Sequence, residues 1–224
     1  MRKRRYIYSS GISSAVVPTS GPHTIYGLLN LVAEGDSITG LSNSYAHISA
    51  TRLAAYSTFV TTVHNLAIPG ATSADLRNRA AAADAAYSAG KTNVFTVLIG
   101  TNDFRNGQTY SGVLGNGISG WLADLSAYLD ARRLVYDHVI AMTILPWVNF
   151  QDSDRATVNA GIRALVGDHA TGLIDFAADP VMGADGAYTN ATLYVSTDQV
   201  HPTDYGFGLL ADIYTPYIAA IMGA

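Results

Sequence analysis

The sequence predicts a three-layer α/β/α sandwich built on a five-stranded parallel sheet. From Thr24 onward, strand-like apolar runs alternate with helix-like stretches, and the chain contains five of each. Several of the strand-like runs end in glycine beside small polar residues. This pattern is typical of open α/β folds, in which helices cover both faces of a parallel sheet and ligands bind beyond the carboxyl ends of the strands.

The strand-like segments are short apolar runs, and they cover residues 25–33, 58–67, 93–99, 135–145 and 173–176. The helix-like segments cover residues 44–56, 73–88, 117–133, 154–169 and 205–222. The third of these shows its period most clearly, because Trp121, Leu125 and Leu129 recur on one face. A chain of this length suits one α/β domain, and we expect residues 24–224 to form it.

Residues 1–23 fall outside this pattern and are interpreted as an N-terminal extension. They are rich in Ser and Gly and contain Pro18 and Pro22. An edge strand and the remnant of an upstream module are both open as interpretations. The basic run Arg2–Arg5 is typical of a solvated tail. Ser, Gly and Pro interrupt the segment after it, so no signal peptide is expected and the compartment stays open.

Charge and composition exclude several classes of function. Only 13% of the residues are charged, about half the usual share of roughly 25%. The net charge is −4, and four of the 13 basic residues lie in Arg2–Arg5, so a nucleic-acid surface is not expected. The chain has no cysteine, which excludes disulfides and thiolate metal sites. No apolar run reaches the roughly 20 residues that a membrane span needs.

The first polar block, Gly35-Asp36-Ser37, follows the first strand-like run. Gly35 lets the backbone turn sharply, because it has no Cβ. Ser37 then lies between the carboxyl end of a strand and the amino end of a helix. Its hydroxyl would face the ligand crevice, and its N–H would lie in the positive field of a helix start. Ser37 is thus a candidate nucleophile, although a serine here can also act only as a helix cap.

The next two strand-like runs end in a similar way. Gly70 closes the stretch Asn65-Leu-Ala-Ile-Pro-Gly70, and the third strand leads into Gly100-Thr101-Asn102-Asp103. Taken singly, Gly70 can be a turn and Asn102-Asp103 a helix cap. Three such ends on consecutive strands favour a binding or catalytic site at this edge of the sheet.

A serine nucleophile needs a base that accepts its proton, and the best candidate lies near the C-terminus. His201 is preceded by Asp198, so a single turn could bring the carboxylate to the imidazole and orient it. Pro202 indicates a loop here, because it disfavours helical conformation at His201. A metal site is disfavoured, since no second histidine has helical ligand spacing.

Four blocks in this order resemble the SGNH hydrolases, also called the GDSL esterase/lipase superfamily. They are GDSI at 35–38, the glycine of NLAIPG at Gly70, GTND at 100–103 and DQVH at 198–201. The resemblance extends from about Ile25 to the C-terminus and implies a flavodoxin-like SGNH hydrolase fold. Ile38 stands where leucine is commoner, a conservative change.

The resemblance also implies a mechanism. Ser37 would be the nucleophile, His201 the base and Asp198 its orienting partner. The oxyanion hole would consist of the N–H groups of Ser37 and Gly70 and the side-chain amide of Asn102. No metal or organic cofactor is implied.

Substrate choice is the least determined property. The expected activity is that of a carboxylesterase acting on short-chain esters, with acetyl groups on carbohydrate as one substrate class. Candidate pocket residues are the apolar side chains Ile38, Phe104, Trp147 and Val200, with Leu76, Val148 and Phe150 as further candidates. The aromatic ones can equally be core residues. A catalytically silent glycan-binding module and an acyltransferase with the same triad are the alternatives, and the oligomeric state stays open.

Overall fold

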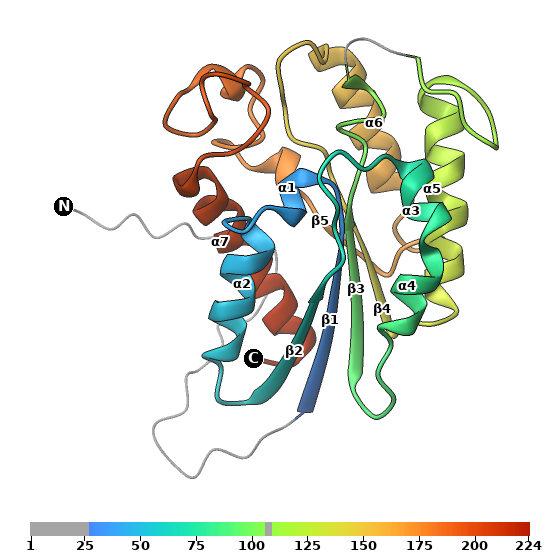
Figure 1. Cartoon of the computed structure of the whole chain (residues 1–224), viewed down its shortest axis with the longest axis vertical. Coiled ribbons are helices and arrows are strands. Elements are labelled where there is room, and N and C mark those ends of the chain that lie inside the picture. Colours follow the sequence, from blue (N-terminus) through green and yellow to red (C-terminus); the bar gives the residue numbers. More distant parts are fainter. Residues whose placement is uncertain (1–26, 106–108) are drawn as a thin grey trace.

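The computed structural model describes residues 27–105 and 109–224, so the expected extension at 1–23 lies outside the described residues. Its centre is a parallel sheet with strand order β2-β1-β3-β4-β5 (Figure 1). The strands are β1 (Gly27–Gly35), β2 (Phe59–Asn65), β3 (Thr92–Leu98), β4 (His138–Met142) and β5 (Gly172–Ile174). The predicted five-stranded parallel sheet is therefore confirmed.

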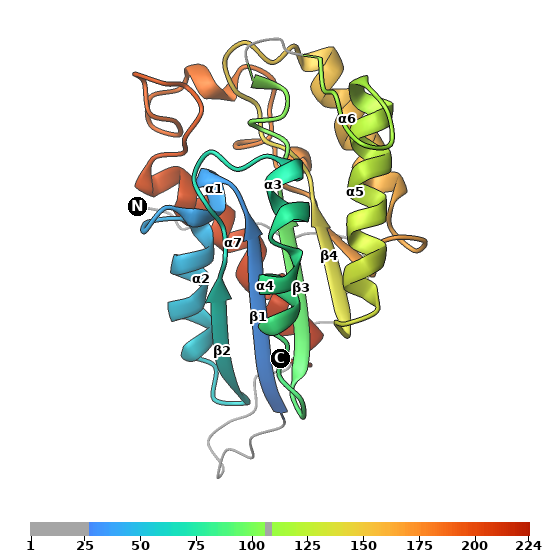
Figure 2. The same ribbon diagram turned by 45° about the vertical axis from the view of Figure 1, so that its right-hand side comes forward.

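Helices cover both faces of this sheet, as Figures 1 and 2 show from two directions. On one face lie α2 (Tyr45–Ala54) and α7 (Asp204–Ile221). On the other lie α3 (Ser73–Asn78), α4 (Ala80–Ala85), α5 (Gly117–Arg133) and α6 (Asp152–Ala164). The short helix α1 (Ser37–Gly40) follows β1, and the 3₁₀ turns η2 (Phe176–Ala178) and η3 (Ala187–Thr189) lie between β5 and α7. This is the predicted three-layer sandwich.

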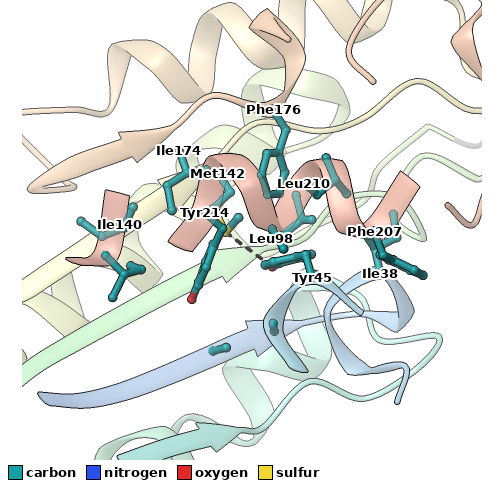
Figure 3. Close-up of a cluster of buried hydrophobic side chains, with 14 of the residues drawn as sticks. Ile38, Tyr45, Leu98, Ile140, Met142, Ile174, Phe176, Phe207, Leu210 and Tyr214 are labelled. Atoms are coloured by element: carbon teal, nitrogen blue, oxygen red, sulfur yellow. Dashed lines mark hydrogen bonds between the residues drawn. The ribbon is translucent and has the colours of Figure 1, made fainter. Parts of the chain in front are cut away.

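Each face of the sheet has its own hydrophobic core. Beneath α2 and α7, the ring of Tyr45 lies 5.2 Å from Phe176 and 5.0 Å from Tyr214, close to Met142 (Figure 3). Beneath α5, fully buried Trp121 joins the opposite core. Strand β1 is buried on both faces, which explains why it reads as a continuous apolar run in the sequence.

The strand order positions the site. Strand β1 pairs with β2 on one side and with β3 on the other, and Gly35 is aligned with Leu98. After β1 the chain continues to β2 on one side of the sheet, and after β3 it continues to β4 on the other side, so the two connections diverge. A crevice at the carboxyl ends of two such strands is where open α/β sheets bind ligands. Helix α1 begins at this point (Figure 1).

Several helices and strands begin or end at other residues than the sequence predicts. The helix expected over 117–133 matches α5, but the one expected over 73–88 is divided into α3 and α4 at Arg79. Strand β1 continues to Gly35, two residues past its predicted end, because its pairing with β3 continues to Gly35 and Leu98. Gly35 has a φ of 153°. A Cβ at Gly35 would lie 2.3 Å from the carbonyl oxygen of Leu98.

The last two strands are shorter than predicted. Strand β4 ends at Met142 and β5 at Ile174, although runs to 145 and 176 were expected. Beyond β4, the backbone N–H of Ile144 donates to the side chain of Asn159 at 2.7 Å instead of to a neighbouring strand. In the described part of the chain, no helix is both long enough and apolar enough to cross a bilayer.

Candidate active site

Ser37 is the first residue of α1 and follows β1 after a single residue, Asp36. Asp36 caps this helix, because its carboxylate accepts a hydrogen bond from the N–H of Ile38 at 3.0 Å. Asp36 is fully buried, and this burial raises its pKa to about 6 despite the Ile38 N–H, which favours the charged form. The sequence interpretation assigned no role to Asp36, yet this residue fixes the turn that presents Ser37.

Ser37 and His201 lie 164 positions apart in the chain and meet at the edge of the sheet. The Nε2 atom of His201 is 2.8 Å from the Ser37 hydroxyl oxygen, and its Nδ1 is 2.8 Å from a carboxylate oxygen of Asp198. A carboxylate can only accept, so Nδ1 carries the proton of the neutral ring. Nε2 is then free to accept from the Ser37 hydroxyl.

The loop at 198–201 holds its own carboxylate in place. The other oxygen of Asp198 accepts hydrogen bonds from the N–H groups of Val200 at 2.9 Å and His201 at 3.0 Å. Burial raises the pKa of Asp198, but these N–H groups and the His201 ring outweigh it, and the pKa lies below its usual value. Gln199 makes the tight turn with a φ of 53°, which is uncommon for a residue with a side chain.

Solvent and ligands can reach this row of three side chains. The His201 side chain is 30% exposed and that of Asp198 is 38% exposed, while Ser37 is half-buried. The row therefore places a hydroxyl, an imidazole and a carboxylate side by side, where a ligand in the crevice can reach them. This arrangement can take a proton from the hydroxyl and make its oxygen a nucleophile.

Gly70 lies on the loop between β2 and α3, in the left-handed region at a φ of 85°. A Cβ added there would have no atom within 4 Å, so the space beside it is open. The loop is joined to β1, since Ile68 N–H donates to the Gly35 carbonyl at 3.2 Å. In residues 27–105 and 109–224, the N–H groups of Gly70 and Ser37 have no hydrogen-bond partner.

The loop after β3 is bonded to the Gly70 loop at two points. The side-chain nitrogen of Asn102 donates to the Ala71 carbonyl at 2.9 Å. The next residue, Asp103, accepts from the N–H of Ser73 at 3.0 Å and from its hydroxyl at 2.6 Å. The predictions missed this role of Asp103, because Ser73 is 30 residues away and no local pattern indicates the pair.

The candidate pocket residues fall into two groups. Ile38 is 2% exposed and packs in the core beneath α7, near Phe207 (Figure 3), and Trp147 is also 2% exposed. These two side chains do not line an accessible surface; in a helical turn, Ile38 points about 100° away from Ser37 and thus inward. Phe104 lines a cavity, and Val200 is 9% exposed and packs in the opposite core, the one beneath α5.

That cavity has a volume of about 270 Å³ and lies beside the amino ends of α5 and α6. Its wall includes the rings of Phe104, Tyr110 and Phe150 and the polar side chains of Asn149, Gln151 and Asp154. The Phe150 ring stacks on Phe104 at 5.5 Å and on Trp147 at 4.1 Å. Val148, which precedes the lining residue Asn149, donates from its N–H to the Gln199 carbonyl at 3.1 Å, so the segment next to this wall is bonded to the loop that carries His201.

No group of three potential metal-ligating side chains occurs within the described residues. The structure places the Ser37 hydroxyl, the His201 imidazole and the Asp198 carboxylate in one row, and the backbone N–H groups of Ser37 and Gly70 are without a partner in the described residues.

The comparisons with known proteins identify the family. Residues 33–209 match the GDSL-like lipase/acylhydrolase family, and the chain belongs to this family. It is thus a carboxylic ester hydrolase, as the four sequence blocks predict. No curated protein sequence matches the chain.

Several solved structures share the fold. The psychrotrophic esterase EstA from Pseudoalteromonas sp. superposes with a TM-score of 0.65 at 16% identity, over 87% of this chain and 100% of its own. TesA superposes with a TM-score of 0.67 at 20% identity, over 85% of this chain and 98% of its own. The acetylxylan esterase Axe2 from Geobacillus stearothermophilus superposes with a TM-score of 0.61 at 21% identity, over 86% of this chain and 94% of its own.

Proposed function

We propose that the protein is a serine esterase that hydrolyses short-chain carboxylic esters through an acyl-enzyme on Ser37. The observation that carries this proposal is the unbroken row from the Ser37 hydroxyl to the His201 ring to Asp198, with both contacts at 2.8 Å. A hydroxyl whose proton can pass to a neutral imidazole is an activated nucleophile.

In the first step, Nε2 of His201 takes the proton of Ser37 as its oxygen attacks the ester carbonyl carbon. The carbonyl electron pair moves to oxygen. The backbone N–H groups of Ser37 and Gly70 and the side-chain amide of Asn102 stabilise that oxyanion. When the intermediate collapses, His201 gives its proton to the leaving alcohol and the carbon–oxygen bond breaks. The acyl group stays on Ser37.

In the second step, water replaces the alcohol. His201 takes a proton from the water, the hydroxide oxygen bonds to the acyl carbon, and the carboxylic acid leaves as Ser37 regains its proton. Asp198 stays ionised throughout, because its pKa is low, and it stabilises the positive ring that forms in each step.

The core packing of Ile38 and Trp147 supports a short acyl group. Both side chains were candidates for an apolar wall beside Ser37, and both are buried with 2% exposure. A long acyl chain needs such a wall to leave water, since each buried CH₂ contributes about 0.8 kcal/mol. Without these two side chains, acetyl and similarly small groups fit best.

The cavity beside Phe104 supports a carbohydrate as the alcohol part of the ester. Flat aromatic rings and the polar side chains of Asn149, Gln151 and Asp154 share its wall. Aromatic faces pack against the C–H faces of sugars, and amides and carboxylates bond their hydroxyls. One esterase of the same fold, Axe2, is described as an acetylxylan esterase.

The test is a series of p-nitrophenyl esters from acetate to decanoate, measured beside acetylated xylo-oligosaccharides on wild type and Ser37→Ala. We expect acetate to turn over fastest, turnover to fall as the chain lengthens, and Ser37→Ala to be inactive. Faster turnover of decanoate would contradict the short-chain assignment. Binding of the oligosaccharide without cleavage of any ester would identify a glycan-binding module instead.

An acyltransferase would use the same side chains with a sugar or alcohol in place of water. The same assay separates the two reactions when glycerol or xylose is added to it. Hydrolysis predicts free acetic acid as the dominant product, whereas dominant transfer of acetyl to the added alcohol would contradict it.

A further inference from the structure

Arg79 occupies the break between α3 and α4, which the sequence pattern does not predict. The segment 73–88 contains neither glycine nor proline, yet the helix ends and restarts at Arg79, with φ −112° and ψ 17°. A helix interrupted without a breaker residue indicates that the interrupting side chain has partners elsewhere.

Those partners are two backbone carbonyls at the carboxyl ends of β1 and β2, next to the active site. One guanidinium nitrogen of Arg79 donates to the Leu66 carbonyl at 3.0 Å, and the other donates to the Gly35 carbonyl at 3.3 Å. Gly35 lies two residues before Ser37, and Leu66 lies four residues before Gly70. The Arg79 side chain thus joins the loop of the nucleophile to the loop of a proposed oxyanion donor.

A buried acidic group holds Arg79 in this position. The Nε of Arg79 is 3.5 Å from a carboxylate oxygen of Glu34, a side chain with no exposed surface. The other Glu34 oxygen accepts a hydrogen bond from the Tyr128 hydroxyl. Glu34 precedes Gly35 in β1, so the anchor of the arginine belongs to the strand that the arginine also contacts.

We infer that Arg79 is a positioning residue for the esterase reaction, because it fixes the Ser37 loop and the Gly70 loop relative to each other. The inference rests on the proposed function of those two residues. The distance between the nucleophile and the oxyanion donors must be maintained when the tetrahedral intermediate forms. A misplacement of about 1 Å between reacting groups can cost roughly 100-fold in rate.

Arg132 supplies a matched control within the same cluster. Arg132 is 4% exposed, and its guanidinium lies 4.9 Å above the ring of Tyr128. Its polar contacts are the Ala80 carbonyl at 3.1 Å and Asp84 at 3.2 Å, on α4 and away from the two loops. Arg132→Met removes the same charge from the same neighbourhood without releasing either site loop.

The experiment compares wild type, Arg79→Met, Arg79→Lys and Arg132→Met in two measurements. The first is kcat and KM on p-nitrophenyl acetate. The second is hydrogen–deuterium exchange of peptides covering residues 35–41 and 65–71. We expect Arg79→Met to lower kcat roughly 10- to 100-fold with KM changed less than threefold, and to raise exchange in both peptides. Arg79→Lys should recover part of the loss, and Arg132→Met should change neither measurement.

Every other outcome either contradicts the inference or calls for a second variant. If Arg79→Met behaves like Arg132→Met, Arg79 has no positioning role. If exchange rises in both loops while kcat is unchanged, the contact is structural only. If Arg79→Met does not fold, the double variant Glu34→Gln/Arg79→Met, which has no unpaired carboxylate, replaces it. If wild type shows no turnover that depends on Ser37, the proposed function fails. The effect of Arg79 on the two loops is then judged by hydrogen exchange alone, and a rise in one loop only, or in neither, contradicts it.

Discussion

The side-chain nitrogen of Asn102 donates a hydrogen bond to the Ala71 carbonyl at 2.9 Å, next to Gly70. An amide nitrogen has two protons, so this contact leaves a second N–H and fixes its direction. The bond thus orients the Asn102 side chain from the loop that carries Gly70. It makes the Asn102 amide a preorganised donor instead of a mobile one.

Replacement of Asn102 by alanine removes that donor. We expect Asn102→Ala to lower kcat on p-nitrophenyl acetate by roughly 10²- to 10³-fold with little change in KM, because an oxyanion donor acts mainly in the transition state. Asn102→Asp should lose a similar amount, since a carboxylate has the same shape without the donor. A loss below tenfold for Asn102→Ala would remove Asn102 from the oxyanion hole.

The bonds from Ser73 to Asp103 predict an effect on stability. Asp103→Asn keeps the size of the side chain but replaces one accepting oxygen by a donor that faces the N–H and hydroxyl of Ser73. We expect the free energy of unfolding to fall by about 1–3 kcal/mol, as for a buried donor left unpaired. Urea denaturation measures this loss. Asp130→Asn, which changes an exposed ion pair with His169, should shift it by less than about 1 kcal/mol.

The burial of Asp36 predicts a pH-dependent stability. Its pKa rises from 3.8 to about 6 on folding, so the folded protein holds a proton that the unfolded chain releases. The protonated Asp36 therefore contributes to the free energy of unfolding below pH 3.8. As the pH rises to 6, this contribution is lost and the free energy of unfolding falls by about 3 kcal/mol. Asp36→Asn cannot ionise and should not show this loss.

The measurement for Asp36 is denaturant unfolding of wild type and Asp36→Asn at intervals from pH 4 to pH 7. Carboxyls that do not interact with Asp36 titrate in both proteins and cancel in the difference, and Asp103, whose charge acts on Asp36, is the exception. We expect wild type to become steadily less stable than the variant as the pH rises across this range. A difference that stays constant with pH would show that Asp36 is already ionised throughout.

In the proposed mechanism Asp198 orients the base, so its removal should affect rate more than binding. We expect Asp198→Ala to lower kcat by roughly 10³- to 10⁴-fold, because the His201 ring loses the partner that fixes its Nδ1 proton and stabilises its positive form. Asp204→Ala, in an exposed residue that bonds Asn43 at 2.6 Å, is the control and should retain full activity. Equal losses in both variants would indicate a general disturbance of this end of the chain.

The sequence predicts the fold, and it indicates the candidate site residues, because their signals are local. Strand runs that end at Gly35, near Gly70 and at Gly100 indicate a parallel sheet and its ligand edge. The contacts that support these residues are not local. Arg79 reaches Gly35 across 44 residues, and the partner of Ser73 is 30 residues away, so no window of sequence contains either pair.

Ile38 shows why the pocket is the least predictable part. Its place beside Ser37 suggests the substrate surface, but the helical turn of α1 directs it into the core beneath α7. The direction of a side chain after a sharp turn depends on the geometry of that turn. A helix of four residues such as α1 is too short to leave a hydrophobic pattern in the sequence, so this geometry cannot be predicted from it.

The most direct test of the account is covalent labelling of wild type and Ser37→Ala with an organophosphonate ester, followed by peptide mapping in a mass spectrometer. We predict one adduct per chain, located on the peptide that contains Ser37, and none in the variant. An adduct on another residue, or no adduct on the wild-type protein, would contradict an activated Ser37.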